Sequence, residues 1–78
     1  MQVIFSKSAT KSLRGMPRKD ADAMIAKLEL YASSGSGDVV KLLGEPFHRL
    51  RHGNWRAIFE IDGDILVVRI AHRREVYE

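Results

Sequence analysis

The chain has 78 residues, of which 45% are hydrophobic and 29% are charged, and its formal net charge is +3. Such a composition is typical of one small folded domain. It excludes both a disordered chain and an enzyme built from separate cofactor and substrate domains. The sequence contains no cysteine, which excludes a disulfide framework and thiolate metal sites and agrees with a cytoplasmic location. No apolar run reaches the length of a signal-peptide core or a membrane span, so we expect no membrane association.

The N-terminal residues predict a strand followed by a short helix. Residues 2–5 (QVIF) are rich in β-branched and aromatic side chains, which favours a strand. Ser6 or Ser8 can cap the helix that follows, because a serine oxygen accepts a hydrogen bond from a free N–H of the first turn. Gly15 and Pro17 then end or bend this helix.

A second helix is predicted from near Pro17 to the Ser- and Gly-rich residues 33–37, which end it. Its apolar residues recur at steps of three and four and form one stripe: Ala21, Met24, Ile25, Leu28 and Tyr31. A stripe of this kind is typical of a helix that covers a sheet. Residues 38–44 are interpreted as one helical turn or an irregular connection, and Pro46 disfavours helix at Glu45.

The C-terminal part predicts three antiparallel strands, at residues 47–51, 55–61 and 65–71. The turn-forming residues 52–54 separate the first two strands, and residues 62–64 separate the second from the third. The Asp-Gly pair in the second turn is a strong hairpin signal. We therefore expect an α+β fold over a single domain, residues 1–78. In this fold two N-terminal helices pack on one face of a small antiparallel sheet.

Residues 47–77 contain six arginines and no lysine, whereas every lysine lies at or before Lys41. Arginine and lysine carry the same charge, but only arginine offers a planar fork that binds two phosphate oxygens at once. The C-terminal sheet is therefore interpreted as a surface for a phosphate-bearing partner or substrate.

The two turns should gather these arginines toward one end of the sheet, with Asp62 and Asp64 at the far end. The arginines concerned are Arg49, Arg51, Arg56, Arg69, Arg73 and Arg74. Residues 47–59 contain no acidic side chain, so a bound polyanion would relieve the repulsion among them. Arg69 is interpreted separately, as a side chain that pairs with Glu60 or lies along the sheet edge.

The expected register follows from the turns. If Asp62-Gly63-Asp64 sets the pairing of the last two strands, Arg56 lies opposite Ile70 and Arg73 lies just beyond. A first turn of three residues places Arg51 opposite Trp55. We expect the large aromatic ring of Trp55 to anchor the core near this first turn.

The run RLRHGNWRAIFEID, from Arg49, and the later run VVRIAHRREVYE resemble the RelE/ParE superfamily of bacterial toxin–antitoxin toxins. The pattern is Arg-Leu-Arg, then a glycine, an aromatic residue and an arginine that open a strand, then a hairpin and a closing Glu-Val-Tyr. RelE-like members are ribosome-dependent endoribonucleases that cut messenger RNA in the decoding site. ParE-like members poison DNA gyrase and lack the nuclease residues. The RelE-like branch is favoured here.

The resemblance implies site residues. Arg56 matches the arginine that opens the central strand of RelE-like nucleases, Arg73 the arginine after the last strand, and Tyr77 the closing tyrosine, and these three are the candidate catalytic residues. The candidate RNA-binding residues are Arg49, Arg51, His72 and Arg74. Phe47 falls where those nucleases have a lysine. The candidates for the missing proton-transfer group are His48, His52 and His72, with His72 the best placed, and the alternative for each is a structural or surface role.

The expected chemistry is that of a metal-independent endoribonuclease without a cofactor. RNA carries its own nucleophile, the 2′-hydroxyl, so the protein must orient it, stabilise charge at phosphorus and move protons. The histidines lack the close spacing of a zinc site. By the resemblance, the partners are a cognate antitoxin, the ribosome and mRNA, in the cytoplasm. Two alternatives remain open, a gyrase inhibitor without nuclease activity and an inactive interaction module.

Overall fold

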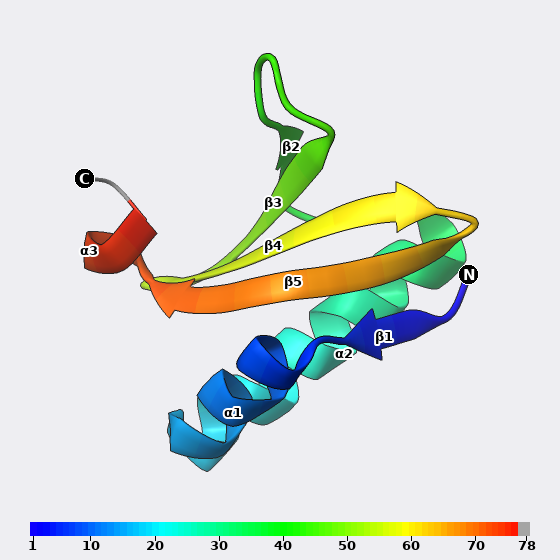
Figure 1. The fold of residues 1–78 in the computed structure, drawn as a ribbon. Coiled ribbons are helices and arrows are strands. Elements are labelled where there is room, and N and C mark those ends of the chain that lie inside the picture. Colours follow the sequence, from blue (N-terminus) through cyan, green and yellow to red (C-terminus); the bar gives the residue numbers. More distant parts are fainter. Residues whose placement is uncertain (77–78) are drawn as a thin grey trace.

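A computed structural model describes residues 1–76 of the chain. The elements follow one another in the order β1 (Val3–Phe5), α1 (Lys7–Gly15), α2 (Arg18–Ser34), β2 (Val39–Lys41), β3 (Phe47–His52), β4 (Trp55–Asp62), β5 (Asp64–His72) and α3 (Arg73–Val76). Within this part of the chain, five strands form one sheet in the order β1-β5-β4-β3-β2, and α1 and α2 lie on one side of it (Figure 1). The predicted fold class is confirmed. The sheet is antiparallel except that β1 runs parallel to β5.

The passage from β1 into α1 is fixed by Ser6. Its hydroxyl oxygen accepts a hydrogen bond from the N–H of Ala9 (3.0 Å) and donates one to the carbonyl oxygen of Val68 (3.0 Å). The same side chain therefore caps α1 and attaches its start to β5, because one hydroxyl can both accept and donate. Of the two serines considered from the sequence, Ser6 is the cap.

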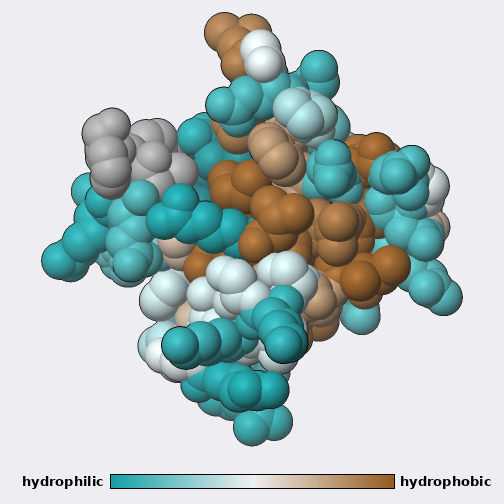
Figure 2. All heavy atoms as spheres, in the orientation of Figure 1, coloured by the Kyte–Doolittle hydropathy of each residue, from teal (hydrophilic) through white to brown (hydrophobic). Residues whose placement is uncertain are grey.

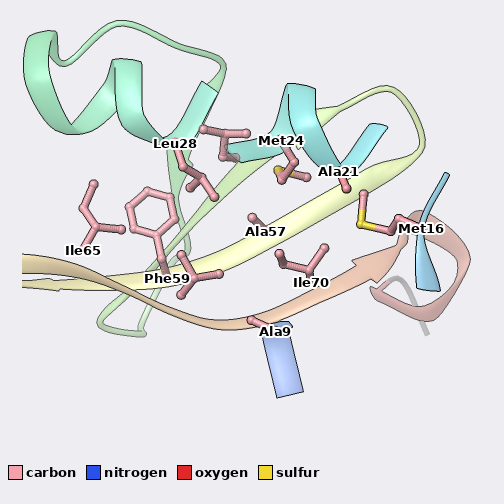
Figure 3. Close-up of a cluster of buried hydrophobic side chains, with 11 residues drawn as sticks. Ala9, Met16, Ala21, Met24, Leu28, Ala57, Phe59, Ile65 and Ile70 are labelled. Atoms are coloured by element: carbon pink, nitrogen blue, oxygen red, sulfur yellow. The ribbon is translucent and has the colours of Figure 1, made fainter. Parts of the chain in front are cut away.

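The core lies between α2 and the helix-facing side of the sheet. The side chains of Ala21, Met24 and Leu28 point from α2 toward the strands (Figure 3) and are 0–7% exposed. They meet Phe59, which is fully buried, and the ring of Tyr31 lies tilted against it with centroids 5.7 Å apart. The stripe predicted on this helix is therefore the face that covers the sheet. The helix α2 ends at Ser34, and Gly35 caps it at φ +78°, a left-handed conformation that glycine adopts without a Cβ clash.

Residues 38–44 differ from the sequence-based expectation, because they contain the strand β2. Val39 pairs with Leu50 and packs against the core, and the N–H groups of Leu42 and Arg51 bond to the carbonyl oxygens of Phe47 and Asp38. If these residues formed a helical turn, the carbonyl oxygen of Phe47 and the N–H of Arg51 in β3 would lose these hydrogen-bond partners. The β-branched pair at positions 39 and 40 favours the strand as well.

The register also differs by one residue, at the first turn and at a bulge within the second hairpin. The first turn contains two residues rather than three, because Gly53 at φ +56° lets the chain reverse tightly; Arg51 therefore faces Arg56 instead of Trp55. The pairing of β4 with β5 shifts at a bulge between Ile58 and Phe59, so Arg56 lies opposite Ala71 instead of Ile70. A bulge adds a residue to one strand, and turn positions alone do not reveal it.

Candidate nucleic-acid interface

One face of the sheet is left uncovered by α1 and α2. Leu50, Ala57 and Ile70 are paired across β3, β4 and β5 and are buried against the helices, so their sequence neighbours point to the opposite side. We call this opposite side the open face. Figure 2 shows hydrophobic residues gathered over its middle and hydrophilic residues around them. The apolar residues that the register places on it are Ile4, Val40, Phe47, Ile58 and Leu66.

Four arginines stand on the open face in two adjacent rows. In one row Arg51 faces Arg56, and in the next Arg49 and Arg69 lie on either side of Ile58. Because neighbouring strands are about 4.8 Å apart, the backbones of Arg51 and Arg56 are one strand spacing apart, and those of Arg49 and Arg69 are two spacings, roughly 10 Å, apart. The predicted gathering of arginines at one end is confirmed, and we call these four residues the arginine rows. Asp62 and Asp64 pair at the far end of the same hairpin, also as expected.

Arg56 lies deeper than its neighbours in the arginine rows. Its side chain is 5% exposed, and its Nη1 donates hydrogen bonds to the carbonyl oxygens of Gly53 (2.8 Å) and Trp55 (3.0 Å). The guanidinium therefore holds the first turn closed while its positive charge remains beneath the open face. Trp55 is partly buried against the core and meets His72 edge-on at 5.3 Å, so its predicted anchoring role is confirmed.

Arg51 has a partner that the sequence did not reveal. Its Nε donates to Oδ2 of Asp38 at 2.8 Å, with both side chains about half exposed. Asp38 comes from the segment that we interpreted as an irregular connection, and it reaches Arg51 because β2 pairs with β3. The two residues also line a hollow between α2 and β3 together with Lys27. The positive charge of Arg51, which we expected to lack an acidic neighbour, is therefore balanced by Asp38.

Arg69 lies on the open face beyond the end of β1 and is exposed. Its Nη2 donates to the carbonyl oxygen of Glu75 at 3.4 Å. The register places it opposite Ile58, whereas Glu60 stands one row away between Phe47 and Leu66. The suggested pairing with Glu60 is therefore replaced by a contact with α3.

The short helix α3 carries two more arginines next to the arginine rows. Arg73 and Arg74 are exposed, and the N–H of Arg73 bonds to the carbonyl oxygen of Asn54. His72 precedes the helix and caps it: its Nδ1 accepts from the N–H of Arg74 (3.4 Å), while Oε1 of Glu75 accepts from the N–H of His72 (3.0 Å). This reciprocal arrangement resembles a capping box with histidine in place of serine. Tyr77 lies outside the described residues.

The register places His72, paired with Trp55, on the helix side of the sheet, and the other two histidines point to the same side. The ring of His48 stacks on Phe59 with centroids 5.4 Å apart. His52 bridges to α2, with Nδ1 2.9 Å from Nζ of Lys27 and Nε2 3.1 Å from Oδ1 of Asp20. Because an ammonium group can only donate, Nδ1 accepts and the Nε2 proton faces Asp20. The sheet therefore separates both rings from the arginine rows.

Two further observations bear on ligands. No helix within residues 1–76 is long and apolar enough to cross a membrane. In the same part of the chain, no group of three or more histidine, cysteine, aspartate or glutamate side chains is arranged to hold a metal ion.

The chain is similar to known proteins over nearly its whole length. Residues 3–77 match the family model described as ParE toxin of type II toxin–antitoxin system, parDE. Toxin RelE3 of Methanocaldococcus jannaschii is 31% identical over an alignment of 85 positions, which covers 100% of this chain and 97% of that protein.

Solved structures show the same likeness. A chain of the RelB–RelE antitoxin–toxin complex from Methanococcus jannaschii superposes with a TM-score of 0.79 at 28% identity, covering 95% of this chain and 94% of that one. A chain of the intact E. coli RelBE toxin–antitoxin complex superposes with a TM-score of 0.73 at 21% identity, covering 91% and 94%. The second likeness concerns the fold alone.

Proposed function

The chain belongs to the ParE toxin family of type II toxin–antitoxin systems, within the RelE/ParE superfamily, and we propose that it is a ribosome-dependent endoribonuclease that cuts messenger RNA and so inhibits translation. The observation that carries the proposal is the pair of arginine rows beside α3, on the sheet face that α1 and α2 leave uncovered. Such a surface suits a strand of closely spaced phosphates.

The proposed reaction uses the nucleophile that RNA itself carries. The 2′-oxygen attacks the adjacent phosphorus, and the bond from that phosphorus to the 5′-oxygen of the next nucleotide breaks. The products are a 2′,3′-cyclic phosphate and a 5′-hydroxyl. One proton leaves the 2′-hydroxyl and one reaches the 5′-oxygen, so the protein has to supply orientation, positive charge and proton transfer.

The site residues divide these tasks. Arg73 is exposed at the start of α3 and is our candidate for binding the non-bridging phosphate oxygens as their charge develops. Arg56 is enclosed, so we propose that it acts as a fixed positive charge beneath the phosphate and as a support of the first turn. Tyr77 is our candidate for proton transfer or for stacking on a base. The substrate strand would be held by Arg49, Arg51, His72 and Arg74.

Cell-free translation tests the proposal. Adding the purified chain should cut actively translated messages at codon-spaced positions, and Arg73→Ala should lower the cleavage rate about 100-fold, the usual effect of losing one group that stabilises developing charge. Arg73 is a suitable site for substitution because its exposed side chain contributes little to folding. Lys41→Ala is the matched control, since it removes an exposed cation from β2, away from the arginine rows.

Messages that stay intact with the unaltered chain would contradict the nuclease proposal. A parallel assay of DNA gyrase then distinguishes the alternatives. Loss of supercoiling with intact messages would assign the chain to the gyrase-poisoning branch. No effect in either assay would leave an inactive interaction module. Because the proposed substrate is translating mRNA, a cytoplasmic location follows from the proposal.

We also propose that a cognate antitoxin covers the open face. This face combines exposed apolar residues, Ile4 at 46% and Val40 at 44%, with the arginine rows. An acidic and apolar segment that becomes ordered on binding would add a helix or a strand to the sheet. It would bury the exposed apolar residues and neutralise the charge of the arginine rows. It would thereby block the phosphate site.

Two isoleucines of similar exposure test where the antitoxin binds. Ile4 lies on the open face at 46% exposure and Ile61 on the helix side at 40%. Ile4→Asp should weaken binding of the purified cognate antitoxin at least tenfold in calorimetry, because it places a charge in an apolar contact facing acidic residues. Ile61→Asp should bind within about twofold of the unaltered chain. Equal affinities for both variants would place the antitoxin elsewhere.

A further inference from the structure

The first 19 residues contain five basic side chains and no acidic one, so they carry more positive charge than the whole chain's net +3. The basic residues are Lys7, Lys11, Arg14, Arg18 and Lys19, and the first acidic residue is Asp20. None of them belongs to the arginine rows. They lie on α1 and at the start of α2, which both cover the other side of the sheet (Figure 1).

Three of these cations form one face of α1. Lys7, Lys11 and Arg14 follow one another at steps of four and three residues, so they share a side of the helix. The opposite side carries Ala9, which is fully buried, and Leu13, which packs against the core. With a rise of about 1.5 Å per residue, the row extends roughly 10 Å along the helix axis. We call Lys7, Lys11 and Arg14 the α1 basic face.

The α1 basic face borders a hollow of the surface. The hollow is lined by its three cations, by Thr10 and by Phe5 at the end of β1. It therefore combines positive charge with a hydroxyl group and an aromatic ring that is partly buried against the core. Nucleic acids can contact all three kinds of group: their phosphates bind cations, their sugar hydroxyls form hydrogen bonds and their bases stack on aromatic rings.

Two of the three cations of the α1 basic face, Lys7 and Lys11, are unfavourable for the helix that bears them. Lys7 is in the first turn, where the helix dipole disfavours a cation, and that turn contains no acidic residue. Lys7 and Lys11 are like charges four residues apart, which repel each other. Arg14 suits the dipole because it lies in the last turn, so helix stability accounts for Arg14 but not for Lys7 and Lys11, whereas a bound anion would offset both unfavourable effects.

We propose that the α1 basic face binds the phosphate backbone of folded, double-stranded RNA. The helix packs against β5, with Ala9 fully buried, so its basic side is the side that remains for a ligand. A row of cations on one side of a helix can contact successive phosphates and recognise shape, which is how double-stranded RNA is usually bound. The hydroxyl of Thr10 can bond to a 2′-hydroxyl, which RNA has and DNA lacks.

This proposal does not rest on the nuclease activity. The α1 basic face and the arginine rows belong to different sides of the sheet, so each can be altered alone. Together they would let the protein attach to a structured RNA with one side while its open face meets a single strand.

Charge reversal on α1 tests the proposal with the purified full chain and a labelled 20-base-pair RNA duplex. The double variant Lys7→Glu/Lys11→Glu should bind the duplex at least tenfold more weakly at about 0.1 M salt. Its thermal midpoint should be unchanged or higher, because acids in the first turn suit the helix dipole. Weaker binding therefore cannot be attributed to unfolding. The neutral variant Lys7→Gln/Lys11→Gln should reduce the slope of log affinity against log salt by about 1.5 to 2.

Lys41→Glu is the control, because it reverses an exposed cation on β2 and should bind the duplex within about twofold of the unaltered chain. A DNA duplex of the same sequence should bind more weakly than the RNA. Three results would overturn the proposal: unchanged RNA affinity of the double variant, equal weakening by Lys41→Glu, and competition by polyglutamate as effective as that by RNA. The last would assign the α1 basic face to an acidic protein partner. Arg73→Ala should leave duplex binding intact. We expect this result whether or not the chain cleaves mRNA, so a failure of the nuclease proposal would not by itself contradict the duplex-binding proposal.

Discussion

Arg56 shows how one side chain can serve the fold and the proposed site together. It is the buried charged residue of the described chain, at 5% exposure, and two backbone carbonyl groups of the first turn accept from its Nη1. Burial of a charge is costly unless hydrogen bonds compensate it. Its position opposite Arg51 nonetheless keeps the charge at the end of the sheet where phosphate is proposed to bind.

Arg56→Ala should therefore destabilise the fold as well as affect activity. We expect a loss of about 2–3 kcal/mol in the free energy of unfolding, because two charge-assisted hydrogen bonds disappear and their carbonyl acceptors stay partly enclosed. Urea unfolding followed by circular dichroism measures it. Arg74→Ala, on the exposed surface of α3, should change stability by less than about 0.5 kcal/mol. A similar small effect of Arg56→Ala would show that the turn does not depend on the guanidinium.

The turn between β3 and β4 is the element that positions the arginine rows. Gly53 has φ +56°, and its carbonyl oxygen accepts from Arg56, while the carbonyl oxygen of Asn54 accepts from the N–H of Arg73. Below the sheet, His52 attaches the same strand end to Asp20 and Lys27 of α2. The two-residue turn is therefore fixed by Arg56 and Arg73 through its carbonyl oxygens and by His52 through α2. This leaves little freedom in the placement of Arg56 and Arg73.

A pair of glycine substitutions tests the conformation of this element. Gly53→Ala should cost about 1–2 kcal/mol, because a Cβ is disfavoured at positive φ even though the space around it is open. Gly15→Ala, at the end of α1 with equally open space and no positive φ, should instead stabilise the protein by about 0.5–1 kcal/mol. Thermal or urea unfolding measures both. A neutral effect at Gly53 would mean that the turn relaxes to another conformation.

On the scale of the whole molecule, the helices and the sheet share one core. Residues of α1, α2, β3, β4 and β5 belong to the same buried cluster. We therefore expect the chain to unfold as one cooperative unit, which is what the single-domain prediction requires.

Trp55, the only tryptophan, begins β4 and reports on that end of the sheet by fluorescence. Far-UV circular dichroism reports mainly on the helices. The two urea transitions should coincide, with one midpoint and an m value of about 1 kcal/mol per molar. Separate midpoints would show that the sheet end and the helices unfold independently, and the single-domain prediction would then be wrong.

Local signals in the sequence determined the order and type of most elements. Caps and stops at Ser6 and residues 33–37, the apolar stripe of α2 and the Asp-Gly hairpin are properties of neighbouring residues, and each is present as expected. The same holds for the gathering of arginines at one end of the sheet. A register error of one residue changes which residue lies opposite but leaves all of these arginines at the same end.

The tertiary structure alone decided the rest. The strand β2 forms because β3 offers it a partner, and the two-residue turn and the bulge set each arginine's neighbour. The partners Asp38 of Arg51 and Asp20 of His52 are 13 and 32 residues distant along the chain. Pairing over such distances depends on which strands meet and on which face each side chain points to. For that reason the sequence placed the histidines and the arginines in one group, and only the folded sheet showed that all three histidines lie on the helix side, opposite the arginine rows.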